Sequence, residues 1–388
     1  MNSSRIEKYC CGCGLCSHWQ EGHYDSRGFF RPNERITESG FDTSVCYCNS
    51  LAGTSEPASW WGPMRSAQYS WSCDEGIRET ASSGGTLTAL CAYMLKSGLV
   101  DGVVQVSRDS GSQIRTNVAL SVSPADVIRC AGSRYAGSAV LANLFDQIER
   151  NKRYAVVAKP CDARVLRSWL TLNDGWKDTF PYILSFFCGG TPTRQANVRL
   201  LSEMGVKEDD LADFWYRGHG WPGMATAVRH DGTMSTMEYE SSWGRILGRD
   251  LQEICRFCWE GTGEAADLSC GDGWYVADGR PSFEETAGRN ITLTRTEAGK
   301  RLLEGAVASG EVEIEQIEDL DVLSAMQPGQ YVRKAAMFSF VLAMRLAHKE
   351  TPRYSLREIS RWSRSIPLTM RCRMFLGTLR RITRGKIN

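Results

Sequence analysis

A run of four cysteines within seven positions, Cys10 to Cys16, constrains this chain more than any other feature. Cys10, Cys13 and Cys16 are each separated by two residues, so their thiolates can converge on one small site. Soft sulfur ligands of this kind select zinc, Cu(I) or an iron–sulfur cluster. The sequence therefore predicts a metal site in this run.

The spacing matches the first three ligands of the bacterial 4Fe–4S motif, in which the fourth cysteine comes four positions later. That position holds Gln20, so we expect Cys46 to be the fourth ligand, with Cys48 or Cys11 as alternatives. Because zinc sites more often pair two separated CxxC hooks, three successive spacings favour the cubane cluster. The other interpretations are free thiols or a zinc site built from Cys10, Cys13, Cys46 and Cys48.

A second set of cysteines is dispersed along the chain. Cys161 and Cys188 follow the expected strands 154–158 and 182–187, and Cys255 and Cys258 form a CxxC pair. Four thiolates from three loops could bind a second 4Fe–4S cluster. The alternative is that Cys161 and Cys188 are ordinary buried cysteines, which are common in protein cores.

The middle of the chain alternates expected strands and helices, which predicts a mixed α/β fold. Expected helices cover 87–95, 139–150, 163–170 and 297–307, and expected strands cover 100–106 and 291–295. We expect four parts. The first is a small ferredoxin-like, cysteine-rich iron–sulfur module (1–56) with few apolar residues, held together by its metal. An α/β half (57–194), a second half with the CxxC ligands (195–330) and a helical basic tail (331–388) follow.

Composition limits the functions open to the chain. The 388 residues carry a formal net charge of +1, which argues against a nucleic-acid-binding protein. The absence of an export signal and of a long apolar run predicts a cytoplasmic protein, where clustered cysteines bind metal rather than form disulfides. The segment from Arg353 to Asn388 has ten Lys or Arg and one acidic residue. It predicts either a basic amphipathic helix for a membrane surface or partner, or a helix packed on the body with a solvated basic face.

Several polar residues are candidates for binding or catalysis. The loop of Ser82, Ser83, Gly84, Gly85 and Thr86 precedes an expected helix, where free N–H groups and the helix dipole favour phosphate; it could equally be an ordinary helix-capping turn, with Ser82 or Ser83 as N-cap. The remaining candidates each also have an alternative interpretation with no role in binding or catalysis. They are Lys159 (a phosphate or flavin partner, or a surface lysine), His219 (an acid/base, or structural) and Asp272 (a ligand contact, or a turn residue).

Taken together, these motifs resemble the coenzyme F420 hydrogenase/dehydrogenase beta-subunit family. The resemblance covers roughly residues 8–330 and rests on an ordered set: the cysteine run, 82–85, 98–102, 132–135, Lys159-Pro160-Cys161, the CxxC pair, Ala266-Asp267 and Gly271-Asp272. It implies FAD and one or two 4Fe–4S clusters. By resemblance, Ser82 to Thr86 with Ser133, Arg134 and Tyr135 line the FAD site, and Cys161, Cys188, Cys255 and Cys258 hold the cluster near the flavin. Lys159 departs from the family, which has a small residue there, and Asp162 stands where Gln or Asn is frequent.

The sequence thus predicts an iron–sulfur flavoprotein oxidoreductase. Electrons from a one-electron carrier such as ferredoxin would enter at the outer cluster and pass through the inner cluster to FAD. The flavin would then reduce a small-molecule substrate, namely a deazaflavin, a tetrapyrrole or a sugar-linked intermediate. The alternatives are an electron-transfer subunit of a larger complex and a zinc-stapled interaction protein without enzymatic activity.

Overall fold

The structure is a computed structural model that describes residues 6, 8–33, 36–50 and 60–385. The expected boundary between residues 56 and 57 lies outside the described residues.

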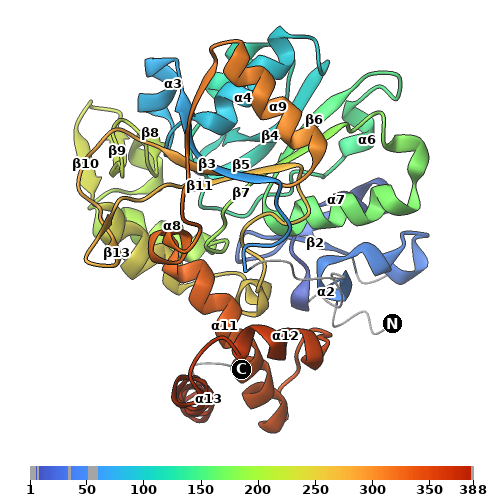
Figure 1. The fold of residues 1–388 in the computed structure, drawn as a ribbon, viewed down its shortest axis with the longest axis vertical. Coiled ribbons are helices and arrows are strands. Elements are labelled where there is room, and N and C mark those ends of the chain that lie inside the picture. Colours follow the sequence, from blue (N-terminus) through green and yellow to red (C-terminus); the bar gives the residue numbers. More distant parts are fainter. Residues whose placement is uncertain (1–5, 7, 34–35, 51–59, 386–388) are drawn as a thin grey trace.

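An eight-stranded mixed sheet forms the centre of the molecule (Figure 1). Its four inner strands are parallel neighbours, and the strands on either side pair antiparallel. In spatial order the strands are β15 (Val312–Gln316), β3 (Ser66–Ser72), β14 (Asn290–Thr294), β11 (Leu268–Asp272), β7 (Tyr182–Phe186), β6 (Tyr154–Ala158), β4 (Gly102–Asp109) and β5 (Ser112–Ser121).

Helices cover both faces of this sheet, as expected for a largely parallel sheet. Neighbouring residues of β4 show the division, because Val103 packs into one apolar cluster and Val104 into another. One face is covered by α4 (Thr86–Lys96) and α9 (Glu297–Ala308), with α3 (Glu75–Thr80) and α5 (Pro124–Arg129) beside α4. The other face is covered by α7 (Pro160–Leu172) and by the N-terminal segment.

Smaller elements surround the main sheet. A three-stranded antiparallel sheet packs with α8 (Arg194–Glu203). Its strands are β8 (Leu211–Trp215), β9 (Ala225–Arg229) and β10 (Met234–Met237). Two-stranded ribbons are formed by β1 (Gly22–Tyr24) with β2 (Phe30–Pro32), and by β12 (Val276–Ala277) with β13 (Arg280–Pro281).

The N-terminal segment shares an apolar core with the body. Ile6, Leu15, Ile36 and Val45 are buried in one cluster with residues such as Val165 of α7. The short helix α2 (Tyr47–Ser50) lies against the same helix. The expectation that few apolar residues support this segment is therefore wrong, because its apolar side chains are buried against the main sheet layer rather than against one another alone.

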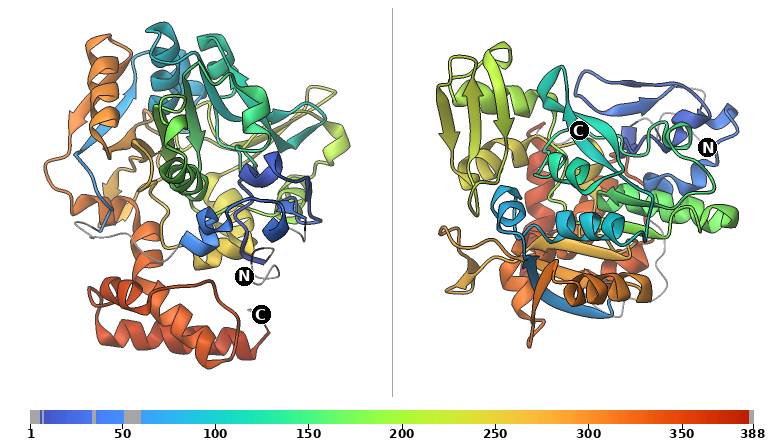
Figure 2. Two further views of the ribbon diagram at one scale, coloured as in Figure 1. Left: turned by 90° about the vertical axis from the view of Figure 1, so that its right-hand side faces the viewer. Right: turned by 90° about the horizontal axis from the view of Figure 1, so that it is seen from above.

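Three C-terminal helices lie together at one end of the molecule, preceded by the short α10 (Val322–Met326) (Figures 1 and 2). They are α11 (Pro328–Leu346), α12 (Leu356–Ser363) and α13 (Leu368–Thr383). The expected domain boundary at residue 331 therefore falls within α11. No helix in the described part of the chain is both long enough and apolar enough to cross a membrane.

The expected elements differ from the observed ones mainly at their ends. The helix expected over 139–150 is reduced to α6 (Leu144–Gln147), because Asn143 adopts a left-handed conformation with φ of 50°. The N-cap of α4 is Gly85 at φ 74°, not Ser82 or Ser83. The helix α7 begins at Pro160, since proline is favoured in the first turn, and Cys161 therefore lies inside that turn.

Candidate functional site

The cysteines expected to bind the outer cluster line one small apolar cavity. Positive φ angles at Gly12 (73°) and Gly14 (85°) turn the chain between them, and a Cβ at Gly14 would lie 2.8 Å from the backbone nitrogen of Ala142. Burial raises the pKa of Cys10 to about 11 and that of Cys16 to about 12. A cation in the cavity would reverse this effect, because metal binding deprotonates a coordinating thiol. The cysteines that line the cavity are Cys10, Cys11, Cys13, Cys16, Cys46 and Cys48.

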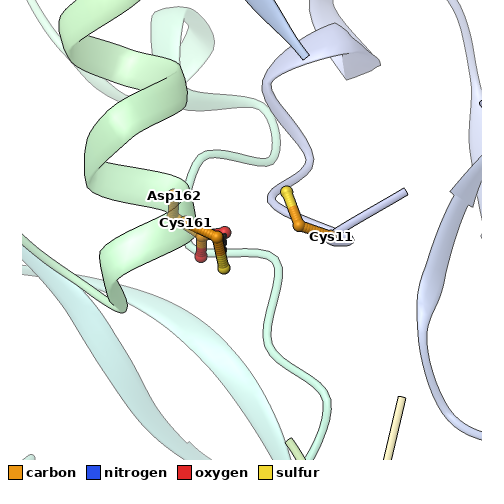
Figure 3. A group of neighbouring side chains, drawn as sticks. All are labelled: Cys11, Cys161 and Asp162. Atoms are coloured by element: carbon orange, nitrogen blue, oxygen red, sulfur yellow. Dashed lines mark hydrogen bonds between the residues drawn. The ribbon is translucent and has the colours of Figure 1, made fainter. Parts of the chain in front are cut away.

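Cys11 also faces a different group. Its sulfur lies within 4.8 Å of both the Cys161 sulfur and a carboxylate oxygen of Asp162 (Figure 3). The Cys161 thiol donates to Asp162 Oδ1 at 3.6 Å. The structure brings Cys161, one of the expected inner ligands, next to the N-terminal run, because it lies in the first turn of α7 and that turn faces the run.

Three of the four expected inner ligands form a second group. Cys188 and Cys258 are close enough to Cys255 that their negative charge adds to burial in raising the pKa of Cys255 to about 12. The Thr191 N–H donates to Cys255 Sγ at 3.4 Å. The hydroxyl of Tyr47, from α2, lies 3.1 Å from Cys258 Sγ. The N-terminal segment therefore contacts the inner group as well as forming the outer one.

A large cavity of about 560 Å³ adjoins the inner group, and its size is typical of a small-molecule site. Lys159 and Cys188 both line it. Gly84 does not, because it packs against the main chain, where a Cβ would lie 2.7 Å from the Ser70 carbonyl oxygen. The other residues expected to bind FAD all line it: Ser82, Ser83, Gly85, Thr86, Ser133, Arg134, Tyr135 and Asp272.

One wall of the cavity presents the N-terminus of α4. Leu87 and Thr88, in the first turn, line the cavity together with the preceding loop. Ser82 Oγ accepts a hydrogen bond of 2.6 Å from the Ser133 N–H, which joins the two segments expected to bind FAD. Backbone N–H groups and the helix dipole at this end favour an anion such as a phosphate.

Another wall is built around Arg217, which the sequence analysis missed. Arg217 is 3% exposed, and its two terminal nitrogens lie 2.9 and 3.1 Å from the Asp272 carboxylate oxygens. Its guanidinium lies 4.6 Å from the Tyr239 ring and 5.3 Å from the Trp274 ring. Asp272 therefore lines the cavity with its carboxylate already paired. The sequence feature that could have identified Arg217 is its position inside the aromatic segment 215–221.

His219, the other candidate for catalysis, is not among the residues that line the cavity. Its φ angle is 55°, its N–H donates to the Glu79 carbonyl at 2.8 Å, and its ring packs against Trp215 at 4.8 Å. The left-handed turn thus keeps His219 out of the lining of this cavity, and its role as an acid/base stays a prediction.

Lys159 is buried rather than a surface residue, being 6% exposed. Its Nζ lies 2.5 Å from Asp162 Oδ2 and donates to the Ser138 carbonyl at 3.1 Å. Burial lowers the pKa of Lys159, but the charges of Asp162, Cys161 and Cys11 oppose this and raise it well above its usual value. The Lys159 ammonium, paired with Asp162, thus lies between the large cavity and the contact of Cys11 with Cys161.

Helix α11 supplies two further residues that the sequence analysis missed. Gln330 Nε2 and Arg333 Nη1 each donate to the Cys188 carbonyl at 3.0 Å, and Arg333 Nη2 donates to the Gly189 carbonyl at 2.5 Å. The charge of Arg333 lowers the pKa of Cys188, opposing the larger effect of burial. The start of α11 therefore fixes the loop that carries Cys188, although the sequence placed position 333 in a separate tail.

Comparisons with known proteins place the chain beside one family. Two family models for the beta subunit of coenzyme F420 hydrogenase/dehydrogenase match the chain, the N-terminal model over residues 67–144 and the C-terminal model over residues 151–320. The chain is 28% identical over 252 residues to the F420-dependent formate dehydrogenase subunit beta of Methanocaldococcus jannaschii, which covers 63% of this chain and 60% of the relative. It is 24% identical over 277 residues to the coenzyme F420 hydrogenase subunit beta of Methanococcus voltae, covering 67% and 87%.

The fold is also similar to that of a solved structure, the F420-reducing NiFe hydrogenase complex from Methanosarcina barkeri. The TM-score is 0.55 with 18% sequence identity, covering 71% of this chain and 91% of the matched chain. The chain spans about 60% of the length of the formate dehydrogenase subunits that it matches.

Proposed function

Because the chain belongs to the coenzyme F420 hydrogenase/dehydrogenase beta-subunit family, we propose that it is an iron–sulfur flavoprotein oxidoreductase. It moves electrons between a one-electron carrier, such as ferredoxin or another redox protein, and a two-electron small-molecule substrate. One observation carries the proposal: a single cavity of about 560 Å³ is lined both by the N-terminal loop of α4 and by Cys188 of the inner cysteine group. We place the protein in the cytoplasm, where thiols stay reduced.

The donor chemistry of both cysteine groups fits iron–sulfur clusters. Cysteine thiolates are the ligands that such clusters take, and six cysteines line the outer cavity in apolar surroundings. Cys10, Cys13, Cys16 and Cys46 would hold the outer 4Fe–4S cluster, with Cys48 as the alternative fourth ligand. Cys188, Cys255 and Cys258 would hold the inner 4Fe–4S cluster, with Cys161, which also lies beside Cys11, as the fourth ligand.

The large cavity fits FAD, which supplies the exchange between one-electron and two-electron chemistry. The first turn of α4 and the Ser82–Ser133 contact suit the phosphates. Tyr135 and Trp274 offer aromatic surface for a ring system. Lys159 is the catalytic residue we propose, because its buried cation lines the cavity and stabilises negative charge that develops there on reduction.

A second candidate is an electron-transfer subunit whose substrate chemistry takes place on a partner protein. The relatives favour this candidate, since they are named as subunits of a formate dehydrogenase and a hydrogenase. The two candidates differ in one measurement. The measurement is turnover of a small molecule by the ferredoxin-reduced chain. If turnover begins only when a partner protein is added, the chain is an electron-transfer subunit.

Anaerobic analysis of iron, zinc, sulfide and flavin tests the proposal. We expect bound FAD and about eight irons per chain if both clusters form. The Cys13→Ser variant should lose about half of the iron and keep FAD, whereas Cys73→Ser, at an exposed cysteine, should lose neither. Colourless protein with stoichiometric zinc and no flavin would show instead that the chain is a zinc-stapled interaction protein.

Paired variants test the catalytic assignment. Lys159→Met should retain iron but slow flavin reduction, because the cation beside the cavity is lost. His219→Ala should reduce flavin at the wild-type rate, since that side chain packs on Trp215 outside the cavity. Equal rates for Lys159→Met and wild type would remove Lys159 from the mechanism.

A further inference from the structure

Helix α13 packs one side on the body and leaves the other side open to solvent. It lies against α11 at the end of the molecule, where two views show the C-terminal helices together (Figures 1 and 2). Thr378 is buried, and Phe375, Leu379 and Ile382 are half-buried on the same side. The apolar stripe of α13 is therefore already used in packing. This agrees with the alternative in which the basic tail is a helix packed on the body with a solvated basic face.

The outer side of α13 carries a row of arginines. Arg373, Arg380 and Arg384 are all exposed, and spacings of seven and four residues place them on one face of the helix. None of the three forms an ion pair with a carboxylate in the described part of the chain. We call Arg373, Arg380 and Arg384 the arginine row.

Charge in this protein is concentrated at this end. Residues 353–385 contain nine arginines and one acidic residue, whereas the whole chain has a formal net charge of only +1. The rest of the chain is therefore net negative. A surface that attracts the protein through α13 must be strongly anionic, and electrostatics will orient the molecule with this end toward it.

Large apolar side chains are exposed among these arginines. Leu376 is 61% exposed on one side of the arginine row, and Met370 is 43% exposed on the other side of it. Arginine with protruding leucine suits the boundary between lipid headgroups and acyl chains, where charges meet anionic headgroups and apolar side chains enter the acyl region. An acidic protein partner would match the charges of the arginine row but would also need an apolar pocket to cover Leu376.

We propose that the outer face of α13 docks the protein on an anionic lipid surface. The arginine row binds the headgroups, and Leu376 and Met370, which flank the row, enter the membrane boundary. This docking does not rest on the redox proposal. It is a property of this chain rather than of the matched family segments, since the family models end at residue 320.

Vesicle binding by the full chain tests the proposal. We expect binding to vesicles of equimolar phosphatidylcholine and phosphatidylglycerol, little binding to pure phosphatidylcholine, and loss of binding at high salt. Each basic residue near an anionic surface contributes about a fivefold change in affinity, so the triple variant R373Q/R380Q/R384Q should bind roughly 100-fold more weakly. A triple lysine variant at the same positions should retain most of the binding.

Matched variants separate this row from general surface charge. R65Q/R129Q/R153Q removes three exposed arginines elsewhere on the body and should bind like wild type. Leu376→Asn should weaken binding while keeping its salt dependence. Equal binding to neutral and anionic vesicles would overturn the proposal. So would an equal loss of binding in R373Q/R380Q/R384Q and R65Q/R129Q/R153Q. Binding to polyglutamate without binding to anionic vesicles would also overturn it, in favour of an acidic protein partner.

Discussion

Arg333 should raise the reduction potential of the inner cluster that we propose. It is the cation that α11 places beside the Cys188 loop, where it donates to the carbonyls of Cys188 and Gly189. Its charge also acts on the Cys255 and Cys258 thiols, lowering their pKa values against the larger effect of burial. Reduction adds negative charge to the cluster, so a nearby cation favours it. Arg333→Met should therefore lower the potential.

The size of this shift follows from Coulomb's law. A unit charge several ångströms away, acting through an effective dielectric constant of about 20, contributes about 2 kcal/mol, and partial exposure of Arg333 reduces this to about 1–2 kcal/mol. For one electron this corresponds to a lowering of roughly 40–90 mV. Arg333→Lys keeps the charge and loses only part of the hydrogen bonding, so its shift should be much smaller.

The assay is an anaerobic redox titration of the holoprotein followed by the spectroscopic signal of the reduced cluster. Arg345→Met is the matched control, because Arg345 is half-buried on the same helix and hydrogen-bonds Thr351 instead of a cysteine loop. Iron and flavin contents must equal those of wild type in every variant. A potential for Arg333→Met within about 10 mV of wild type would refute the reasoning, since the charge would then be screened completely.

Two further substitutions test the packing that supports the site. A glycine-to-alanine change inside a helix ordinarily stabilises it by about 1 kcal/mol. In Gly299→Ala, however, the new Cβ in α9 would lie 1.9 Å from the Asp267 carbonyl oxygen. We therefore expect thermal unfolding to show destabilisation of about 1–3 kcal/mol. Gly305→Ala, on the same helix, meets only the end of a tyrosine side chain at 2.6 Å and should be close to neutral; equal effects would contradict the steric argument. Glu260→Gln should lower the free energy of unfolding by about 3 kcal/mol, measured by anaerobic denaturation. The reason is that Arg164 Nε lies 2.9 Å from Glu260 Oε2, and the Arg164 side chain, only 10% exposed, would lose its counter-charge. A loss below about 0.5 kcal/mol would show that the amide replaces the carboxylate fully.

The sequence predicted the elements whose signal is local. The strand expected over 154–158 is confirmed as β6, and the helix expected over 297–307 is confirmed as α9 with one more residue. Apolar periodicity and N-capping act within a few residues, so they can be read without knowing the fold. The mixed α/β class and the family were identified in the same way, from patterns and ordered motifs along the chain.

The ends of elements were less predictable. The helix expected over 139–150 is interrupted at Asn143, where the chain turns next to the cysteine run and its N–H donates to Ser17 Oγ. That contact joins positions 126 residues apart. A periodic apolar pattern cannot report such a turn, because the cause lies in a distant segment.

What the sequence by itself determined is therefore the chemistry available: thiols at metal-binding spacing, a small-residue loop before a helix, and a basic C-terminal segment. Only the tertiary structure decided which groups meet. It brought Arg217 and Arg333 to the cavity, directed His219 away from it, and placed Cys161 beside Cys11. The physical reason is that local preferences fix the backbone, whereas side-chain neighbours depend on long-range packing. Arg333 and Cys188 are 145 positions apart in sequence and within hydrogen-bonding distance in the fold.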